Sequence, residues 1–253
     1  MDERIGEPPQ NEFEPRSWVL ASLPPEDLRS LRPHLEAAAL PRGKILLEAG
    51  AALTHAYFVE TGVVALVTVF RSGTAAVSAL VGREGVIGIG ALLGGEVEGG
   101  RYVVHVPGSA LIMDASRFGA ALRQLPRLRT ACEAYASALL GQVLQNAACH
   151  STHTVAERCA RWLLMIHDRS NGDILALTHK SLAEMLGVTG PKAASVTRTL
   201  QKAGMVSCSR EGITVLDRAR LEAAACECYR INRAHCDRLL AGALARPEPS
   251  RSG

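Results

Sequence analysis

The spacing of apolar residues predicts elements of different kinds along the chain. Residues 1–17 have no regular apolar period and are rich in Pro, Glu and Asn, which predicts a flexible arm. Residues 18–40 carry leucines at helical spacing and are predicted to be helical. These apolar positions are Leu20, Leu23, Leu28, Leu31 and Leu35.

From residue 40 to residue 120 the apolar runs become short, and glycines separate them. Fourteen of the 23 glycines lie here, between runs rich in Val, Leu, Ile and Ala. Short strands with regular turn signals predict an antiparallel roll or sandwich of the Greek-key type, and we expect this domain to span residues 18–125. The predicted strands are Tyr57–Val59, Val63–Phe70, Ala75–Val81, Tyr102–Val106 and Ala110–Met113.

One long helix is predicted for residues 126–150. Its inward positions follow alternating steps of four and three, which is the seam of a coiled coil and also the pattern of an ordinary core-facing helix. Polar seam residues can set the register of a helix pair, so Gln142 and Asn146 favour a dimerisation helix. The seam comprises Leu128, Cys132, Tyr135, Leu139, Gln142, Asn146 and Cys149.

Residues 151–230 contain the most distinctive pattern. Thr178 is placed to cap a short helix that ends at Gly187, and Thr189 is placed to cap a second helix with Pro191 in its first turn. Two short apolar runs then flank a polar turn and predict a hairpin. Helix, turn, helix and hairpin make a winged helix-turn-helix, whose second helix fits the major groove of DNA. Residues 231–253 are assigned to the end of a C-terminal helix and a disordered tail.

Charge supports this interpretation only through its distribution. A net charge of +3 is too small to identify a nucleic-acid-binding protein. Between residues 178 and 210, however, five Lys or Arg residues stand against one acidic residue, Glu184. This positive excess suits contact with phosphates, although any solvated helix surface can carry such residues.

Composition narrows the class of protein. A hydrophobic content of 47% supports a folded core, while the longest apolar runs are shorter than the ~20 residues of a membrane helix. The polar N-terminal segment does not resemble a secretory signal, so we expect a cytoplasmic protein without membrane contact. Seven cysteines, an odd number, favour reduced thiols over a disulfide framework.

Five stretches resemble the Crp/Fnr family of bacterial transcription regulators. They are Tyr57–Leu66, Arg71–Gly73, Gly82–Gly88, Glu157–Leu164 and Leu177–Val206. The resemblance covers residues 18–229 and implies an α+β fold with an N-terminal β-roll or jelly-roll sensor domain, a long central dimerisation helix and a C-terminal winged helix-turn-helix. It also implies a homodimer on a palindromic DNA operator, with half-sites about one helical turn apart and RNA polymerase as a further partner.

The sensors of this family do not carry over to the chain. Members that bind cyclic nucleotides use a Glu for the ribose and an Arg-Ser pair for the phosphate, whereas here Ile89 takes the place of the Glu and Tyr102 follows Arg101. Isoleucine accepts no hydrogen bond, so cyclic AMP is not expected to bind. The effector pocket is assigned to Gly88, Ile89, Arg101 and Tyr102, with a surface role for Arg101 as the alternative. The first cysteine is Cys132, so the N-terminal cysteine cluster of iron–sulfur members is absent.

Candidate DNA contacts follow from position within the predicted unit. Exposed residues of the second helix are assigned to base edges: Thr189, Gly190, Lys192, Ser195 and Thr199. Residues at the start of the first helix, along the second helix and at the hairpin tip are assigned to phosphates: Thr178, His179, Lys180, Arg198, Lys202 and Arg210. Well-known members of the family present Arg, Glu and Arg where this chain has Gly190, Pro191 and Ser195, so bidentate recognition of guanine by Arg is lost.

Other chemistry is weaker in the sequence. Cys226 and Cys228 are closer together than a usual zinc pair, and on a helix their thiols would point to different sides. A second candidate set lacks a carboxylate nearby in sequence to orient its imidazoles; it comprises Cys149, His150, His153 and His167. We therefore predict no metal site. Phosphate-binding loops and nucleophile–base pairs are absent from the sequence, so no enzyme is expected.

One alternative of a different class stays open, which is a ligand-sensing signalling module whose winged helix mediates protein–protein contacts. The excess of Lys and Arg in and around the second helix argues against it, because phosphate contact requires that excess and protein contact does not.

Overall fold

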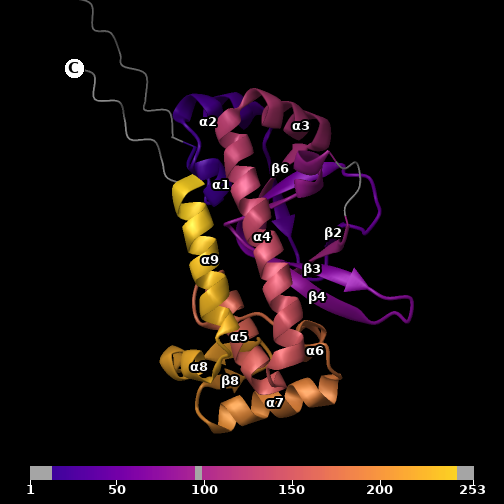
Figure 1. The fold of residues 1–253 in the computed structure, drawn as a ribbon, viewed down its shortest axis with the longest axis vertical. Helices are drawn as coiled ribbons and strands as arrows, with labels where there is room; N and C mark the ends of the chain where they lie inside the picture. The colour runs from indigo at the N-terminus through magenta and orange to yellow at the C-terminus, as the bar shows by residue number, and fades with distance from the viewer. Residues whose placement is uncertain (1–12, 95–98, 244–253) are drawn as a thin grey trace, which may run out of the picture.

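The computed structural model describes residues 13–94 and 99–243 as a β-rich domain, two helices side by side and a small helical domain (Figure 1). The first half contains α1 (Trp18–Ala21), α2 (Pro25–Leu31), the 3₁₀ turn η1 (Arg32–His34), β1 (Glu36–Leu40), β2 (Ile45–Leu47), β3 (His55–Val69), β4 (Ala75–Val81), β5 (Val86–Ile87), η2 (Ile89–Leu93), β6 (Arg101–Asp114) and α3 (Ala115–Gln124). The second half contains α4 (Pro126–Thr152), α5 (Val155–His167), β7 (Ile174–Leu175), α6 (His179–Leu186), α7 (Gly190–Lys202), β8 (Val206–Cys208), β9 (Ile213–Val215), α8 (Arg218–Ala224) and α9 (Cys228–Ala243). No helix within the described ranges has the length and hydropathy of a membrane span.

The β-rich domain is an antiparallel sheet with the strand order β1-β6-β3-β4, in which β2 also pairs with β6 and β5 with β3. The two central strands, β3 and β6, pair along almost their whole length, from His55 opposite Asp114 to Val67 opposite Arg101. The α+β class predicted from the sequence is confirmed. The prediction of separate strands on either side of residues 62 and 108 is wrong. The two strands predicted around Gly62 are one strand, β3, and the two predicted around Gly108 are one strand, β6.

Gly62 and Gly108 lie where β3 and β6 approach each other closely. Gly62 has a φ of +86°, and a Cβ at this position would lie 2.6 Å from the carbonyl oxygen of Val106. A Cβ on Gly108 would overlap the backbone of Thr61. The pairing register shifts at this point, as at a β-bulge. These glycines therefore bend a continuous strand pair instead of ending it.

The predicted N-terminal helix is correct only in its first part. α1 and α2 are followed by a 3₁₀ turn that contains Pro33, which cannot continue an α-helix. From Glu36 the chain is the strand β1, and Glu36 lies opposite Ile112 of β6. The helical spacing of the leucines did not predict this change. Residues 36–40 become a strand because β6, which is distant in sequence, supplies their backbone hydrogen-bond partners.

The end of the predicted flexible arm is attached to the β-rich domain. The backbone amides of Arg16 and Ser17 donate hydrogen bonds of 2.9 and 3.0 Å to the carboxylate of Glu60. The Arg32 guanidinium lies 4.5 Å from the centre of the Phe13 ring. Residues 1–12, and residues 244–253 of the predicted tail, lie outside the described residues.

The face of α4 predicted as a dimer seam packs inside the same chain. Leu128, Cys132 and Cys149 are fully buried, and Leu139 is 8% exposed. Gln142 forms an amide bridge to the edge strand β4, accepting from the backbone N–H of Leu80 at 2.7 Å and donating to its carbonyl at 3.2 Å. The predicted dimer seam is therefore wrong.

The remaining seam residues behave in the same way. Asn146 donates to the carbonyl oxygen of Val77 in β4 at 3.0 Å, and Tyr135 is 3% exposed. Polar residues at seam positions had favoured a helix pair. In the structure they form hydrogen bonds with backbone groups of β4 instead. Spacing along the helix is the same for both roles, so the sequence could not distinguish them.

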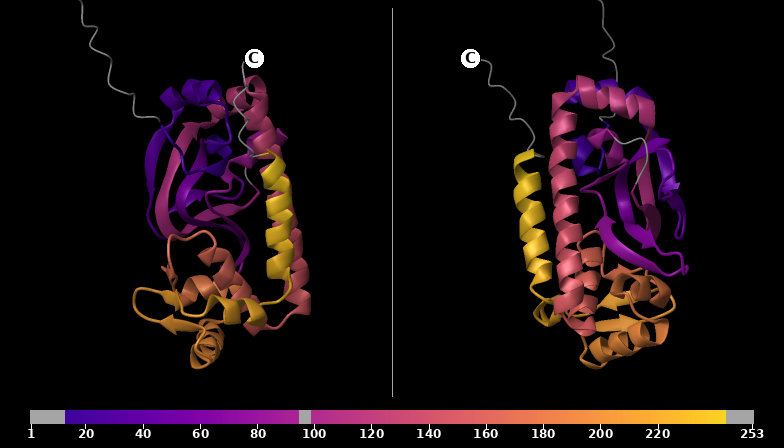
Figure 2. Two further views of the ribbon diagram at one scale, coloured as in Figure 1. Left: turned by 90° about the vertical axis from the view of Figure 1, so that its left-hand side faces the viewer. Right: turned by 45° about the vertical axis from the view of Figure 1, so that its right-hand side comes forward.

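The helix α9 runs alongside α4 for much of its length (Figure 2). It begins at Cys228, and its second part is the helix end predicted within residues 231–253. Gly141 permits the close approach, because a Cβ there would lie 2.5 Å from Nε2 of His235. Tyr229, Asn232 and Leu240 of α9 are buried. α9 therefore covers one side of α4, while the β-rich domain covers another.

A continuous apolar core joins the β-rich domain to the helical domain. Val63, Val77 and Leu80 of the sheet belong to the same buried cluster as Trp162 of α5 and Met185 of α6. α5 begins with a cap at Thr154, which forms a capping box with Glu157. The helical domain is therefore packed on the sheet.

We predict that Gly62→Ala destabilises the fold far more than Gly73→Ala. Both glycines have positive φ, but a Cβ on Gly73 would meet no atom within 4 Å. Gly73→Ala is expected to lower the free energy of unfolding by about 1–2 kcal/mol through strain alone, and Gly62→Ala by more than about 3 kcal/mol because overlap adds to the strain. Urea denaturation measures both values. Equal losses would show that β3 and β6 tolerate a side chain at their bulge.

Candidate nucleic-acid interface

Local signals in the sequence build the two helices at the interface. The Thr178 hydroxyl caps α6 by accepting from the backbone N–H of Ser181 at 3.0 Å. α6 ends at Gly187 with a φ of 63°, the left-handed conformation that favours glycine. α7 then begins at Gly190, after Thr189 in the N-cap position. Thr189 accepts no capping hydrogen bond, contrary to the sequence prediction, so its hydroxyl does not serve the helix terminus.

The helix α7 has one buried side and one exposed side. Val196 and Leu200 are 8% and 4% exposed, and Ala193 and Thr197 are fully buried beside them. The opposite side points away from the rest of the chain, at the end of the molecule farthest from the β-rich domain (Figure 1). All residues assigned to base edges lie exposed on it or at its start: Thr189, Gly190, Lys192, Ser195 and Thr199.

The residues assigned to phosphates surround this side. His179 and Lys180 are exposed in the first turn of α6, and Thr178 is half-buried as its cap. Arg198 and Lys202 are exposed on α7. Arg210 is exposed in the turn between β8 and β9, the wing. α7 itself carries no acidic residue, so the exposed side has a net positive charge.

The acidic residue nearest in sequence, Glu184, faces the β-rich domain. Its carboxylate lies 3.9 Å from Nε2 of His105, which is 3% exposed in β6. Burial lowers the pKa of His105 to about 4 and raises the pKa of Glu184. This contact removes the one negative charge of the helix pair from the DNA-facing side.

Two further contacts hold the helix-turn-helix in place. Arg158 of α5 donates through Nη1 to the carbonyl of Leu186 at 3.0 Å, which satisfies the C-terminal end of α6. The same Nη1 lies 2.6 Å from Nδ1 of His150 at the end of α4. Burial, followed by the Arg158 charge, lowers the pKa of His150 and favours the neutral imidazole that can accept.

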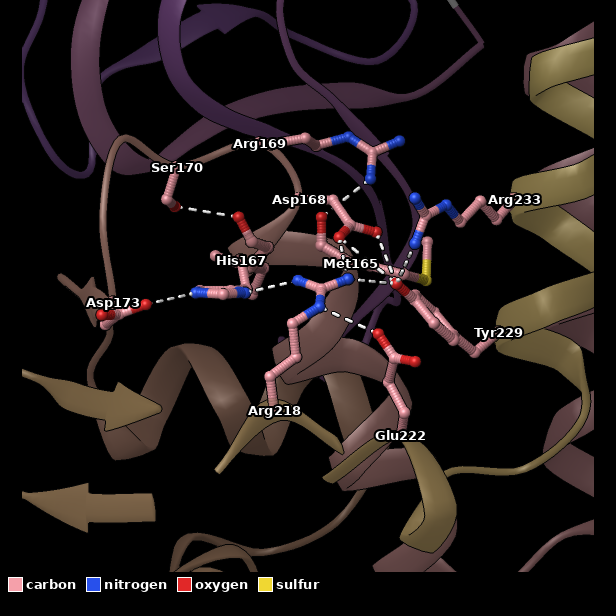
Figure 3. A network of polar contacts seen from close by, with 11 residues as sticks. Met165, His167, Asp168, Arg169, Ser170, Asp173, Arg218, Glu222, Tyr229 and Arg233 are labelled. Carbon is pink, nitrogen blue, oxygen red and sulfur yellow. Dashed lines mark hydrogen bonds and ion pairs between the residues drawn. The ribbon is translucent and has the colours of Figure 1, made fainter. Parts of the chain in front are cut away.

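A network of polar groups joins the end of α5 to α8 and α9 (Figure 3). Arg218 of α8 donates to Asp168 at 2.6 Å and to Glu222 at 2.8 Å. The Tyr229 hydroxyl of α9 donates to Asp168 at 3.0 Å and accepts from Arg233 at 3.2 Å. Asp168, at the end of α5, is therefore joined to α8 through Arg218 and to α9 through Tyr229.

A second link and a cavity lie beside this network. Arg169 donates through Nε to the buried Glu84 carboxylate of the β-rich domain at 2.7 Å. A cavity of about 260 Å³ lies next to this ion pair, between the β-rich domain, α4, α5 and α9. Its polar lining includes Arg83, Asp168 and Arg233. No pattern in the sequence indicated this cavity, because its walls come from five separate segments.

The residues assigned to an effector pocket occupy other places. Ile89 and Tyr102 are 7% and 2% exposed and belong to the apolar core. Gly88 is buried with a φ of 102°, and a Cβ at this position would lie 3.2 Å from Cδ1 of Leu53. Arg101 forms an ion pair of 2.8 Å with Glu48 at the surface. Arg101 therefore already has a carboxylate partner, and the side chains of Ile89 and Tyr102 pack in the core.

The structure also brings together part of the cysteine–histidine set that sequence reasoning had set aside. Cys149, His153, Cys226 and Cys228 form one cluster. His150 contacts Arg158 instead, and His167 contacts Asp173 and Arg218. Cys226 lies in the connection between α8 and α9, not within a helix, so the objection that helical thiols diverge does not apply.

Comparison with known proteins identifies both domains. Residues 38–124 match the cyclic nucleotide-binding domain family, and residues 157–224 match the Crp-like helix-turn-helix domain family. Together these matches cover more than half of the chain, in the order found in Crp/Fnr proteins. The chain therefore belongs to the Crp/Fnr family of transcription regulators, as the resemblance had indicated. A search of curated proteins found no significant match.

Solved structures support the same fold. FixK2 from Bradyrhizobium japonicum is 17% identical, with a TM-score of 0.65 over 76% of this chain and 98% of that one. A Crp/Fnr-family regulator from Eubacterium rectale is 16% identical, with a TM-score of 0.64 over 85% and 99%. The c-di-GMP-responsive regulator CLP of Xanthomonas campestris is 16% identical, with a TM-score of 0.60 over 75% and 98%.

We predict that stability falls on acidification through His105. Its folded pKa of about 4 lies below the ordinary value of 6.5, so the unfolded chain binds a proton that the folded chain does not. The stabilising contribution is complete above pH 6.5 and is lost as the pH falls toward 4, by about 3 kcal/mol in total. Glu184, whose pKa is raised, opposes this effect.

Urea midpoints measured between pH 7 and pH 4 check this prediction. His105→Gln should flatten the profile, whereas the exposed His179→Gln serves as a control that should keep the wild-type slope. An unchanged slope in His105→Gln would contradict the assignment.

Proposed function

We propose that this protein is a cytoplasmic, homodimeric transcription regulator that binds DNA sequence-specifically through α7 and does not require cyclic AMP. The exposed polar side of α7 supports this proposal most directly. Its apolar side is buried in its own domain, and its exposed side carries Lys192, Ser195 and Thr199 with no acidic residue. A rigid helix of this kind fits the major groove of B-form DNA.

Base and phosphate contacts are expected from different residues. Lys192 and Ser195 lie in the first two turns of α7, where a recognition helix contacts base edges. Lys180 lies in the first turn of α6, Lys202 at the end of α7 and Arg210 in the turn of the wing. Groups that surround the helix on several elements suit the sugar–phosphate backbone, which passes on both sides of the groove. The same arrangement favours DNA over a protein partner for the winged helix.

The dimer is proposed to use a different side of α4 from the seam predicted by sequence. Leu140 and Leu144 are 59% and 62% exposed on this helix. They belong to a stripe of exposed residues with steps of four and three, which comprises Glu133, Ser137, Leu140, Leu144, Ala147 and Ser151. Two exposed leucines flanked by small residues suit a close helix pair with a second copy of the chain.

Independence from cyclic AMP is supported by the residues at the family's nucleotide-binding segment. Ile89 packs in the core and offers no acceptor for a ribose hydroxyl. Arg101 is held by Glu48, so a nucleotide phosphate would have to compete with a carboxylate for its guanidinium. Both features would reduce the affinity for a cyclic nucleotide.

We predict that Lys192→Ala relaxes the base preference of DNA binding. Loss of a good base contact should cost about 1–3 kcal/mol on the preferred sequence and little on random DNA. Gel-shift titrations on a selected operator and on a scrambled duplex measure both affinities, at several salt concentrations because phosphate contacts release counterions. Lys44→Ala, in the β-rich domain, is the matched control and should change neither value. Equal weakening on both duplexes would assign Lys192 to phosphate, and salt-insensitive binding would argue against the interface.

The dimer surface gives a separate prediction. Leu140→Glu combined with Leu144→Glu should convert the protein to a monomer, because a helix pair would bury two unpaired charges on each side. Sedimentation velocity measures the change in mass. Leu216→Glu introduces the same charge at a leucine that is 60% exposed outside the stripe, and it should leave the dimer intact. If the double variant stays dimeric, the dimer interface does not include Leu140 and Leu144, and the proposal is wrong.

A further inference from the structure

Three thiols and one imidazole meet where α4 ends and α9 begins. Cys149 lies in the last turn of α4, and His153 is the C-cap residue that directly follows this helix. Cys226 and Cys228 come from the opposite side, in the connection from α8 to α9 and in the first turn of α9. The four potential ligand atoms all lie within 4.8 Å of one another.

The distances between these atoms suit a tetrahedral metal ion. Sγ of Cys149 lies 3.5 Å from Sγ of Cys226, and Sγ of Cys228 lies 3.6 Å from Nδ1 of His153. Around a zinc ion with Zn–S bonds of about 2.3 Å and tetrahedral angles, two sulfurs are about 3.8 Å apart. All three thiols are buried, and they form an apolar cluster of their own. Three Cys and one His are a common ligand set for structural zinc.

Groups around the cluster are placed as outer partners of a metal site. The Gln145 amide donates to Sγ of Cys228 at 3.0 Å. His153 turns Nδ1 toward the thiols, and its Nε2 lies 3.9 Å from the carboxylate of Glu227. Metal-binding histidines commonly donate their second N–H to a carboxylate, and Glu227 lies just beyond hydrogen-bond distance of this nitrogen. Glu227 is the carboxylate that the spacing of the histidines did not reveal, and it lies between the two cysteines.

A buried cation gives independent support. Arg161 is fully buried, and its partners include the Oδ1 atom of Asn146 at 2.6 Å. Within the described residues no carboxylate lies within ion-pair distance of Arg161. Its Nε has no hydrogen-bond partner there either. The thiols of Cys149, Cys226 and Cys228 are the groups whose negative charge would stabilise this guanidinium.

Charge balance follows from these positions. Three thiolates, one neutral imidazole and one Zn²⁺ ion carry a net charge of −1, which offsets the +1 of Arg161. Without a metal ion, three neutral thiols would leave the buried guanidinium without a counter-charge, which is costly in a protein interior.

We propose that these four side chains bind one Zn²⁺ ion as a closed structural site. The ion fastens the connection between α8 and α9 to the end of α4, next to the point where α5 begins. It therefore fixes the start of α9, and with it the winged helix-turn-helix, relative to the long helix. All four coordination positions are filled by the protein, so the site has a structural role and no catalytic one.

Metal analysis of the purified full-length chain tests the proposal. Mass spectrometry of the metal content should find one zinc per chain. After removal of zinc by a chelator, titration with Co²⁺ should give the visible absorption of a tetrahedral thiolate site, and Zn²⁺ should displace it. The melting temperature should fall on chelation and recover with Zn²⁺, because binding to the folded state stabilises it.

Variants locate the site. Cys228→Ser and His153→Ala should each lower the zinc content and weaken the cobalt spectrum, whereas Cys236→Ser, a half-buried cysteine two turns along α9, should change neither. Wild-type protein that holds no zinc and takes up no Co²⁺ would overturn the proposal even if the variants fail to fold. An iron–sulfur chromophore in the purified protein, or a disulfide between Cys149 and Cys226 in place of the metal, would overturn it as well.

Discussion

The amide of Gln142 on β4 is the contact on which the arrangement of the chain depends. Leu80 belongs to an edge strand, and its N–H and C=O groups would lack partners if α4 did not supply them. Gln142 provides both a donor and an acceptor, and Asn146 extends the same bridge to Val77. This contact determines which side of α4 faces the β-rich domain, and therefore which side is left for α9 and which for a second copy.

From this orientation the position of α7 follows through a short series of contacts. The end of α4 carries His150, which contacts Arg158, and Arg158 holds the last carbonyl of α6. Trp162 of α5 and Met185 of α6 share one core with the β-rich domain. The helix-turn-helix is thus held from the α4 end and from the sheet. Any signal that moves α4 relative to β4 would reach α7 through these few groups.

The helix-turn-helix could be predicted from the sequence because its signals are local. Thr178 caps its helix and Gly187 ends it within a few residues of chain, and the alternation of buried and exposed positions in α7 needs no distant partner. The fold class followed in the same way from short apolar runs and glycines. Gly62 was misinterpreted, since a close approach of two backbones and a turn give the same residue type.

The features that sequence reasoning missed depend on segments that are distant along the chain. Spacing along α4 identified an inward side, but the partner of Gln142 is 62 residues away and could not be inferred. The exposed side assigned to α7 matches the structure, whereas Ile89 packs in the core. Cys149 and Cys226 are 77 residues apart, so the sequence showed two separate groups of candidate metal ligands, each too small to form a metal site.

Hydroxyl-radical footprinting of the protein on a selected operator tests the central claim most directly. If α7 of each protomer enters the major groove, protection should appear in two symmetric half-sites about 10–10.5 base pairs apart, centre to centre. A single protected half-site, or protection spread evenly without symmetry, would contradict the account.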